Sequence, residues 1–218
     1  MNQGQDYDGS WRWMTLPSIL TDYQVYIYQF GVFSGTSIIQ IANILSQNNI
    51  ISAKIFGFDS FCGNPEETRE KLTNDAWILG SWSVQKQLNT PNINECIKIV
   101  YEKIKLRIPA TYSVEFITGW FNELKDEIAH NNNMKPAFYI DIDCDLYCST
   151  YDALDFMFRN KLIKTGTLIG YDDWGGSEGW QNHLSGESRA HKEMLEKYNA
   201  SCVEIASHPA NMKVFKII

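Results

Sequence analysis

The sequence predicts an α/β fold: a mostly parallel β-sheet with helices on both faces and an antiparallel strand at the end of the chain. Short apolar runs alternate along the chain with segments of helical periodicity. Two of these runs end in clustered carboxylates, and open α/β sheets bind ligands at the carboxyl ends of their strands. No linker or internal repeat divides the 218 residues, so we expect a single domain over 1–218 that begins with an N-terminal arm, 1–23.

The first half of the chain contains two predicted strands, over 24–30 and 53–58, on either side of a glycine turn and a helix. The helix is predicted by apolar residues at the spacing i, i+3, i+4 and i+7, which are Ile38, Ile41, Ala42 and Leu45. The segment 62–91 has no clear period, and we interpret it as an ordered loop over the site or a surface for a partner.

The second half continues the alternation of strands and helices. Helical periodicity predicts helices near 93–104, 150–160 and 186–198, and apolar runs predict strands at 113–117, 137–142, 166–171, 202–206 and 212–217. A short turn joins the last two runs, so we expect them to pair antiparallel.

The composition excludes several classes of protein. A net charge of −7 and a pI near 5.1 argue against a nucleic-acid partner, which would require a basic face. No apolar stretch has transmembrane length and the polar N-terminus does not resemble a signal peptide, so we expect no membrane association and a cytoplasmic protein. The five cysteines form an odd, scattered set that suits reduced thiols, and Cys144 and Cys148 have no further soft ligands close in sequence for zinc.

Four carboxylates follow two neighbouring predicted strands. Asp143 and Asp145 come after the strand at 137–142, and Asp172 and Asp173 come after the strand at 166–171. Helix capping could explain one aspartate in each loop. It does not explain four, because packed carboxylates repel unless a cation or a shared proton relieves them. The sequence therefore predicts a site for a hard cation.

A second feature is typical of nucleotide binding. Gly31 and Gly35 lie between a predicted strand and a predicted helix, where glycine lets the backbone turn sharply beside a ligand. Asp59 follows the second strand, where α/β folds hold ribose hydroxyls. The Gly-x-Gly-x-x-Gly and Gly-Lys-Ser/Thr fingerprints are absent, which disfavours a nicotinamide enzyme.

These motifs together resemble a known family. Gly31 to Ser37, the stretch Phe58-Asp59-Ser60-Phe61-x-Gly-x-Pro-Glu, Gly119-Trp120-Phe121, the stretch Asp143-x-Asp-Leu-Tyr-x-Ser-Thr and Asp172-Asp173 come in the order seen in the macrocin O-methyltransferase family. The resemblance covers roughly residues 25–200. It implies a Rossmann-like class I methyltransferase fold with seven strands, dependence on S-adenosylmethionine and Mg²⁺, and methylation of sugar hydroxyls in the biosynthesis of natural products or polysaccharides.

The resemblance also implies roles for individual residues. Asp59 would hold the cofactor ribose with Ser60 and Phe61 beside it, and Gly119 and Trp120 would lie near the adenine. The methionine end would be lined by Gly31, Gly35, Thr36 and Ser37. Asp143, Asp172 and Asp173 match the metal ligands, and Asp145 matches the general base. The sequence departs from the family at Gln29, where an acidic residue is usual, and in its short N-terminal extension.

Methyl transfer to an alcohol needs a base and an aligned hydroxyl, and a metal ion with free positions suits a vicinal diol. We therefore expect a saccharide or other small-molecule acceptor. Weaker candidates for substrate contacts are Trp174, Trp180, His183, Arg189 and His191. The alternatives are a metal-dependent glycosyltransferase and a non-catalytic α/β binding module. The sequence does not distinguish a monomer from a homo-oligomer.

Overall fold

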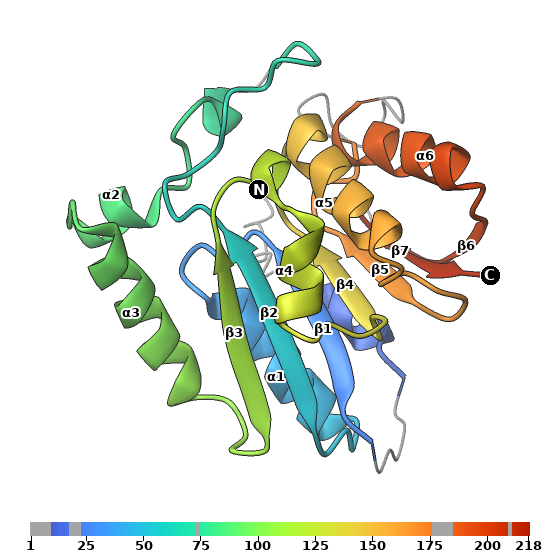
Figure 1. The fold of residues 1–218 in the computed structure, drawn as a ribbon, viewed down its shortest axis with the longest axis horizontal. Coiled ribbons are helices and arrows are strands. Elements are labelled where there is room, and N and C mark those ends of the chain that lie inside the picture. The colour runs from blue at the N-terminus through green and yellow to red at the C-terminus, as the bar shows by residue number, and fades with distance from the viewer. Residues whose placement is uncertain (1–9, 18–22, 73–74, 176–184, 209–210) are drawn as a thin grey trace, which may run out of the picture.

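The fold is built on a seven-stranded sheet with the order β3-β2-β1-β4-β5-β7-β6 (Figure 1). The computed structural model describes residues 10–17, 23–72, 75–175, 185–208 and 211–218. The strands are β1 (Val25–Phe30), β2 (Ala53–Asp59), β3 (Tyr112–Thr118), β4 (Tyr139–Ile142), β5 (Leu168–Tyr171), β6 (Cys202–His208) and β7 (Met212–Ile217). Strands β1 to β5 are parallel, and β7 runs antiparallel to both β5 and β6. The predicted fold class is confirmed.

Helices cover both faces of the sheet. They are η1 (Ser10–Thr15), α1 (Thr36–Gln47), η2 (Asp75–Trp77), α2 (Val84–Leu88), α3 (Ile93–Lys105), η3 (Phe121–Glu123), α4 (Asp126–Asn131), α5 (Tyr147–Arg159) and α6 (Gly186–Tyr198). Residues of α1, α3 and η1 share one apolar core with the sheet, and residues of α4, α5 and α6 share the other. In Figure 1 the α4 to α6 layer lies in front of the strands and α1 lies behind them.

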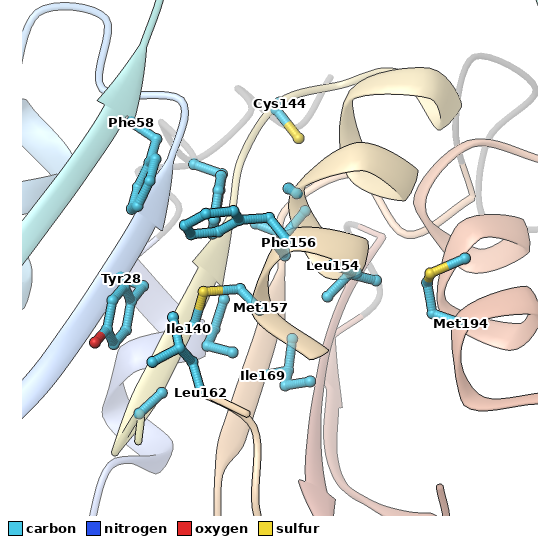
Figure 2. Close-up of a cluster of buried hydrophobic side chains, with 14 of the residues drawn as sticks. Tyr28, Phe58, Ile140, Cys144, Leu154, Phe156, Met157, Leu162, Ile169 and Met194 are labelled. Atoms are coloured by element: carbon cyan, nitrogen blue, oxygen red, sulfur yellow. The ribbon is translucent and has the colours of Figure 1, made fainter. Parts of the chain in front are cut away.

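The alternation of side chains along the central strands sends them to the two cores in turn. In β1, Tyr28 and Phe30 belong to the core under α5, while Val25 and Ile27 belong to the core under α1. Figure 2 shows the first of these cores, where Phe156 and Met157 of α5 face Phe58 and Ile140 of the strands. Burying each such side chain stabilises the fold by about 1.5–3 kcal/mol.

The register brings four strand ends to one level. Phe30 of β1 pairs with Phe58 of β2 and with Ile142 of β4, and Ile142 pairs with Tyr171 of β5. The residues that follow these four positions are Gly31, Asp59, Asp143 and Asp172. A glycine turn and three carboxylates therefore meet along one edge of the sheet.

Five short helical elements were not predicted: η1, η2, α2, η3 and α4. Helix α4 is only six residues long, too short for an apolar stripe to repeat. Helix η1 lies in the segment that we predicted to be an arm, and its Trp13 and neighbouring Leu16 are buried against the α1 core. Within the described residues, none of the helices has both the length and the apolar character needed to cross a membrane.

Candidate functional site

A pocket of about 480 Å³ opens at the carboxyl edge of the sheet. The turn after β1, the end of β2, the loop after β3 and the four predicted carboxylates all line it. Eleven residues predicted from the sequence are in its wall: Gly31, Thr36, Ser37, Asp59, Ser60, Gly119, Trp120, Asp143, Asp145, Asp172 and Asp173. The two halves of the predicted site thus share one cavity.

The turn between β1 and α1 requires glycine at Gly31. This residue has φ +94°, and a Cβ atom there would lie 1.8 Å from the carbonyl oxygen of Asp143. The close approach joins the turn after β1 to the loop after β4. On the other side, Lys103 of α3 donates hydrogen bonds to the Ser34 carbonyl (2.8 Å) and the Thr36 hydroxyl (3.0 Å), so the turn is held from both sides.

Asp59 organises this turn through backbone contacts. Its Oδ2 accepts from the amides of Val32 and Phe33, both at 2.7 Å, and its Oδ1 accepts from the amide of Phe61 at 2.6 Å. Loss of hydration raises the pKa of Asp59, and these amide hydrogen bonds oppose the rise. Oδ2 thus accepts two hydrogen bonds, but Oδ1 has a second lone pair, so Asp59 can also accept from a ribose hydroxyl through Oδ1.

Three of the predicted cofactor residues are set back from the pocket. Gln29 is fully buried, its Nε2 donates to the Gly31 carbonyl at 3.0 Å, and its Oε1 has no partner among the described residues. Gly35 is the N-cap of α1, with φ +76°. The ring of Phe61 is buried in the core beside Phe116, with ring centroids 5.4 Å apart, while its backbone amide donates to Asp59. The place of Phe61 beside the ribose stays a prediction.

The capping interpretation of the carboxylates does not hold. The N-cap of α5 is Leu146 and that of α6 is Ser185, so the carboxylates are free for other roles. Asp145 has φ +64°, a left-handed conformation that aspartate and asparagine tolerate better than most residues. Asn64 Nδ2 donates to its Oδ2 at 2.9 Å, which ties the 62–91 segment to the site.

Asp145 and Asp173 both line the pocket, and the charge of each carboxyl group affects the protonation of the other. Loss of hydration, and then the charges of Asp145 and Asp172, raise the pKa of Asp173 well above its usual value. The pKa of Asp145 is also raised by loss of hydration, but the hydrogen bond from Asn64 opposes that rise. Both carboxyl groups therefore bind a proton more readily than a carboxyl group in water does.

Arg12 of η1 is a site residue that sequence reasoning missed. It pairs with Asp143 (Nη2 to Oδ2, 2.9 Å) and with Asp172 (Nη1 to Oδ1, 2.5 Å), although it is only 1% exposed. Behind them it also pairs with Asp141 in the middle of β4. The one available signal was an aspartate inside an otherwise apolar strand, because a buried carboxylate needs a partner.

Glu187 at the start of α6 is the second site residue that was missed. Its side chain is fully buried, its Oε2 accepts from the amide of Asp173 at 3.0 Å, and its Oε1 has no partner among the described residues. Burial, and then the charge of Asp173, raise the pKa of Glu187 well above its usual value. Among the described residues of the site, the carboxyl groups around Asp173 therefore outnumber the cationic side chain of Arg12.

The donor set at this edge fits a hard divalent cation in its chemistry. The donors are carboxylate oxygens, and they carry more negative charge than Arg12 can neutralise. As the side chains lie, no group of three histidine, cysteine or acidic residues in the described part of the chain is arranged to hold a metal ion. Arg12 already takes one oxygen each of Asp143 and Asp172.

The weaker candidates lie elsewhere. His191 and Trp174 are buried together in an aromatic cluster with Tyr171 and Phe215, away from the pocket wall. Arg189 stacks on the ring of Tyr147 at 4.2 Å. Trp180 and His183 lie outside the described residues. All five cysteines are free thiols, as predicted.

The sheet order, with an antiparallel β7 and a pocket beside the turn after β1, defines a class I methyltransferase fold. The solved calicheamicin methyltransferase CalS11 has the same fold, with a TM-score of 0.66 and 17% identity over 95% of this chain and 75% of CalS11. The O-methyltransferase NovP has a TM-score of 0.60 and 18% identity over 88% of this chain and 71% of NovP. These low identities establish the fold alone.

A comparison with protein-family models identifies the family of this chain. The model described as macrocin-O-methyltransferase (TylF) matches residues 22–200, and the chain belongs to this family. It is therefore an O-methyltransferase of the class that depends on S-adenosylmethionine. No curated protein matches the chain by sequence.

Proposed function

We propose that the protein transfers a methyl group from S-adenosylmethionine to a hydroxyl of a saccharide or another vicinal diol. Asp145 is the general base in this proposal, and a divalent cation, Mg²⁺, is held by Asp143, Asp172 and Asp173. The observation that carries it is the shared pocket, whose wall contains both the glycine turn with Asp59 and the four carboxylates.

Two features support binding of S-adenosylmethionine: open space beside Gly119 and a hydrogen-bond acceptor of Gln29 that has no partner among the described residues. Gly119 has φ +137° and nothing within 4 Å of the position that a Cβ would take, which leaves room for a flat ring beside it. The buried Oε1 of Gln29 has no partner among the described residues and can accept from the cofactor ammonium. Gln29 thus replaces the charge of the usual acidic residue with a neutral acceptor.

Asp145 suits the role of general base because its carboxyl group lines the pocket beside the proposed metal ligands Asp143, Asp172 and Asp173. In the transfer, the acceptor oxygen forms a bond to the methyl carbon, the sulfur–methyl bond breaks, and the hydroxyl proton passes to the Asp145 carboxylate. Asn64 fixes one carboxylate oxygen by donating to Oδ2. A raised pKa brings a carboxylate closer to the operating pH, where general bases are most effective.

Asp143, Asp172 and Asp173 would hold the metal ion, and a bound divalent cation would lower the pKa of the acceptor hydroxyl. The excess of carboxylates over the cation Arg12 supports this assignment, because packed carboxylates repel one another unless a cation relieves them.

Two tryptophans of the 62–91 segment support a sugar as the acceptor. Trp77 and Trp82 line the pocket, and aromatic faces bury the apolar face of a sugar ring while polar groups take its hydroxyls. The apo structure of CalS11 is described as a TDP-rhamnose 3'-O-methyltransferase, in line with a saccharide acceptor.

Calorimetry with S-adenosylhomocysteine, UDP and GDP tests the class of ligand. We expect S-adenosylhomocysteine to bind and the nucleoside diphosphates to bind weakly or not at all. Tight UDP or GDP binding without S-adenosylhomocysteine binding would favour the metal-dependent glycosyltransferase instead.

Turnover tests the chemistry. We expect methylation of one or more members of a panel of sugars and catechols in the presence of Mg²⁺, and loss of that activity in excess chelator. Full activity in chelator would refute the metal half of the proposal. No turnover with any diol, despite cofactor binding, would favour a non-catalytic binding module.

A further inference from the structure

The guanidinium of Arg12 is divided between an anchor and the carboxylates of the pocket. Its Nε and Nη2 donate to the two oxygens of Asp141, at 2.7 and 3.1 Å. Its Nη2 and Nη1 also reach Asp143 and Asp172, both of which line the pocket. Arg12 therefore connects a carboxylate buried in the sheet with two that face the cavity.

Asp141, which anchors the guanidinium, accepts two further hydrogen bonds. Besides Arg12, Asp141 Oδ1 accepts from Trp13 Nε1 at 2.9 Å and from the Tyr139 hydroxyl at 2.8 Å. Trp13 is itself buried at 1% exposure in the core under α1. This end of the guanidinium has its charge balanced within the protein core.

The other end makes contacts that a metal ion would also need. Asp143 and Asp172 are partly exposed to the pocket, at 26% and 24%, and each gives one oxygen to Arg12. A cation bound to these carboxylates would compete for their oxygens and would be repelled by the guanidinium charge. The buried Glu187, with Oε1 unpartnered among the described residues, adds a further carboxyl group behind Asp173.

We propose that Arg12 is the resident cation of this site and that a divalent metal ion competes with its guanidinium for Asp143 and Asp172. Arg12 is a positioning residue that sets how tightly the site takes a metal ion. The inference rests on the metal site of the proposed function, and it gives the N-terminal helix η1 a direct part in that site.

The test measures Mn²⁺ binding directly, by the loss of the electron paramagnetic resonance signal of free Mn²⁺, with Mg²⁺ as competitor. The informative variant is Arg12→Met with Asp141→Asn, which removes the guanidinium together with its anchor, so that no unpaired carboxylate is left at the fully buried position 141. We expect it to bind Mn²⁺ at least about tenfold more tightly than the wild type, because two carboxylates regain their free oxygens.

A matched control makes the same chemical change elsewhere. Arg159→Met with Asp126→Asn removes an arginine–aspartate pair (2.6 Å) that lies on α5 and α4 outside the pocket wall, and it should leave Mn²⁺ affinity unchanged. Binding of S-adenosylhomocysteine checks that each variant is folded. Should the double variant not fold, Arg12→Lys retains the charge near Asp141 without the planar fork and should still bind Mn²⁺ more tightly.

The outcomes separate the inference from the proposed function. Unchanged or weaker Mn²⁺ binding in the folded Arg12 variants would overturn competition while leaving the metal site in place. Mn²⁺ binding by the Arg12 variants but not by the wild type would support competition, because it would mean that Arg12 prevents metal binding altogether. No Mn²⁺ binding by any of the proteins would refute the metal half of the proposed function, and the inference with it.

Discussion

Carboxylates in this site are stabilised in three different ways, each set by the immediate partners of the residue. Asp141 pairs with Arg12 inside the sheet, Asp59 accepts from three backbone amides, and Asp145 accepts from the side-chain amide of Asn64. Each arrangement replaces the water that the carboxylate loses. Substitution of the acidic residues should therefore have different consequences at each position.

Asp145→Asn should separate catalysis from binding. Asparagine tolerates the φ of +64° and keeps the size of the side chain, but it cannot take up the proton of the substrate hydroxyl. We expect turnover to fall by about 10²- to 10⁴-fold, with S-adenosylhomocysteine affinity nearly unchanged in calorimetry. Asp126→Asn, on the distant helix α4, is the control. Near-wild-type turnover of Asp145→Asn would refute the assignment of the base.

Asp59→Asn should weaken cofactor binding and also loosen the turn after β1. The amide would place an N–H group against the backbone amides that now donate to the carboxylate. We expect S-adenosylhomocysteine affinity to fall by about 1.5–3 kcal/mol in calorimetry, the range for a hydrogen bond to a charged group. Unchanged affinity would mean that the ribose is held elsewhere.

Among the structural elements, the turn between β1 and α1 and the loop after β4 form one unit. Their contact at Gly31 is so close that the backbone of one loop depends on the conformation of the other. Because β1 and β4 pair in register up to Phe30 and Ile142, this contact lies at the end of the hydrogen-bonded ladder. The proposed cofactor half and the proposed metal half of the site are thereby coupled through the backbone.

Gly31→Ala tests this contact against a matched glycine. Gly31 and Gly166 both have φ +94°, but only at Gly31 would a Cβ meet another atom, the Asp143 carbonyl oxygen. We expect Gly166→Ala to lower the free energy of unfolding by about 1–2 kcal/mol, the cost of the conformation alone. Gly31→Ala should cost more, about 2–4 kcal/mol, and should also weaken S-adenosylhomocysteine binding. Equal losses in urea denaturation would argue against the close contact.

At the scale of the whole molecule, the two faces of the sheet have different chemistry near the site. The face under α1 carries the buried pair Arg12–Asp141, whereas the face under α5 and α6 carries an aromatic cluster that encloses His191. Tyr171 and His191 lie within hydrogen-bonding distance, 2.7 Å, and the neutral ring can also donate to the thiol of Cys202 at 3.4 Å. Because His191 is buried, its protonation should make the stability of the fold depend on pH.

Burial lowers the pKa of His191 from 6.5 to about 3. Since the folded state disfavours the protonated ring, His191 stabilises the protein above pH 6.5 and loses that contribution as the pH falls toward 3. Between pH 7 and pH 5, the wild type should lose about 2 kcal/mol of unfolding free energy relative to His191→Gln. Urea denaturation of both proteins at the two pH values measures this difference. A pH-independent difference would contradict the buried neutral state.

Much of the fold was predictable because its signals are local. The apolar stripe of α1 at Ile38 to Leu45 was predicted from its period, as was the strand that ends before Asp59. The antiparallel pairing of β6 and β7 was predicted from their short connection and is confirmed. The short helices α4 and η1 were missed because a turn or two of helix leaves no period to detect.

The sequence by itself determined which chemical groups stand at the ends of the strands, because each strand and the loop after it are read from consecutive residues. Tertiary structure alone decided which distant side chains join them. Arg12 meets Asp143 and Asp172 across 131 and 160 positions, and Asn64 meets Asp145 across 81. Such contacts depend on how whole elements pack on the sheet, and no local pattern of residues encodes that packing. The carboxylates of the site were therefore visible in the sequence, whereas the cation that pairs with them was not.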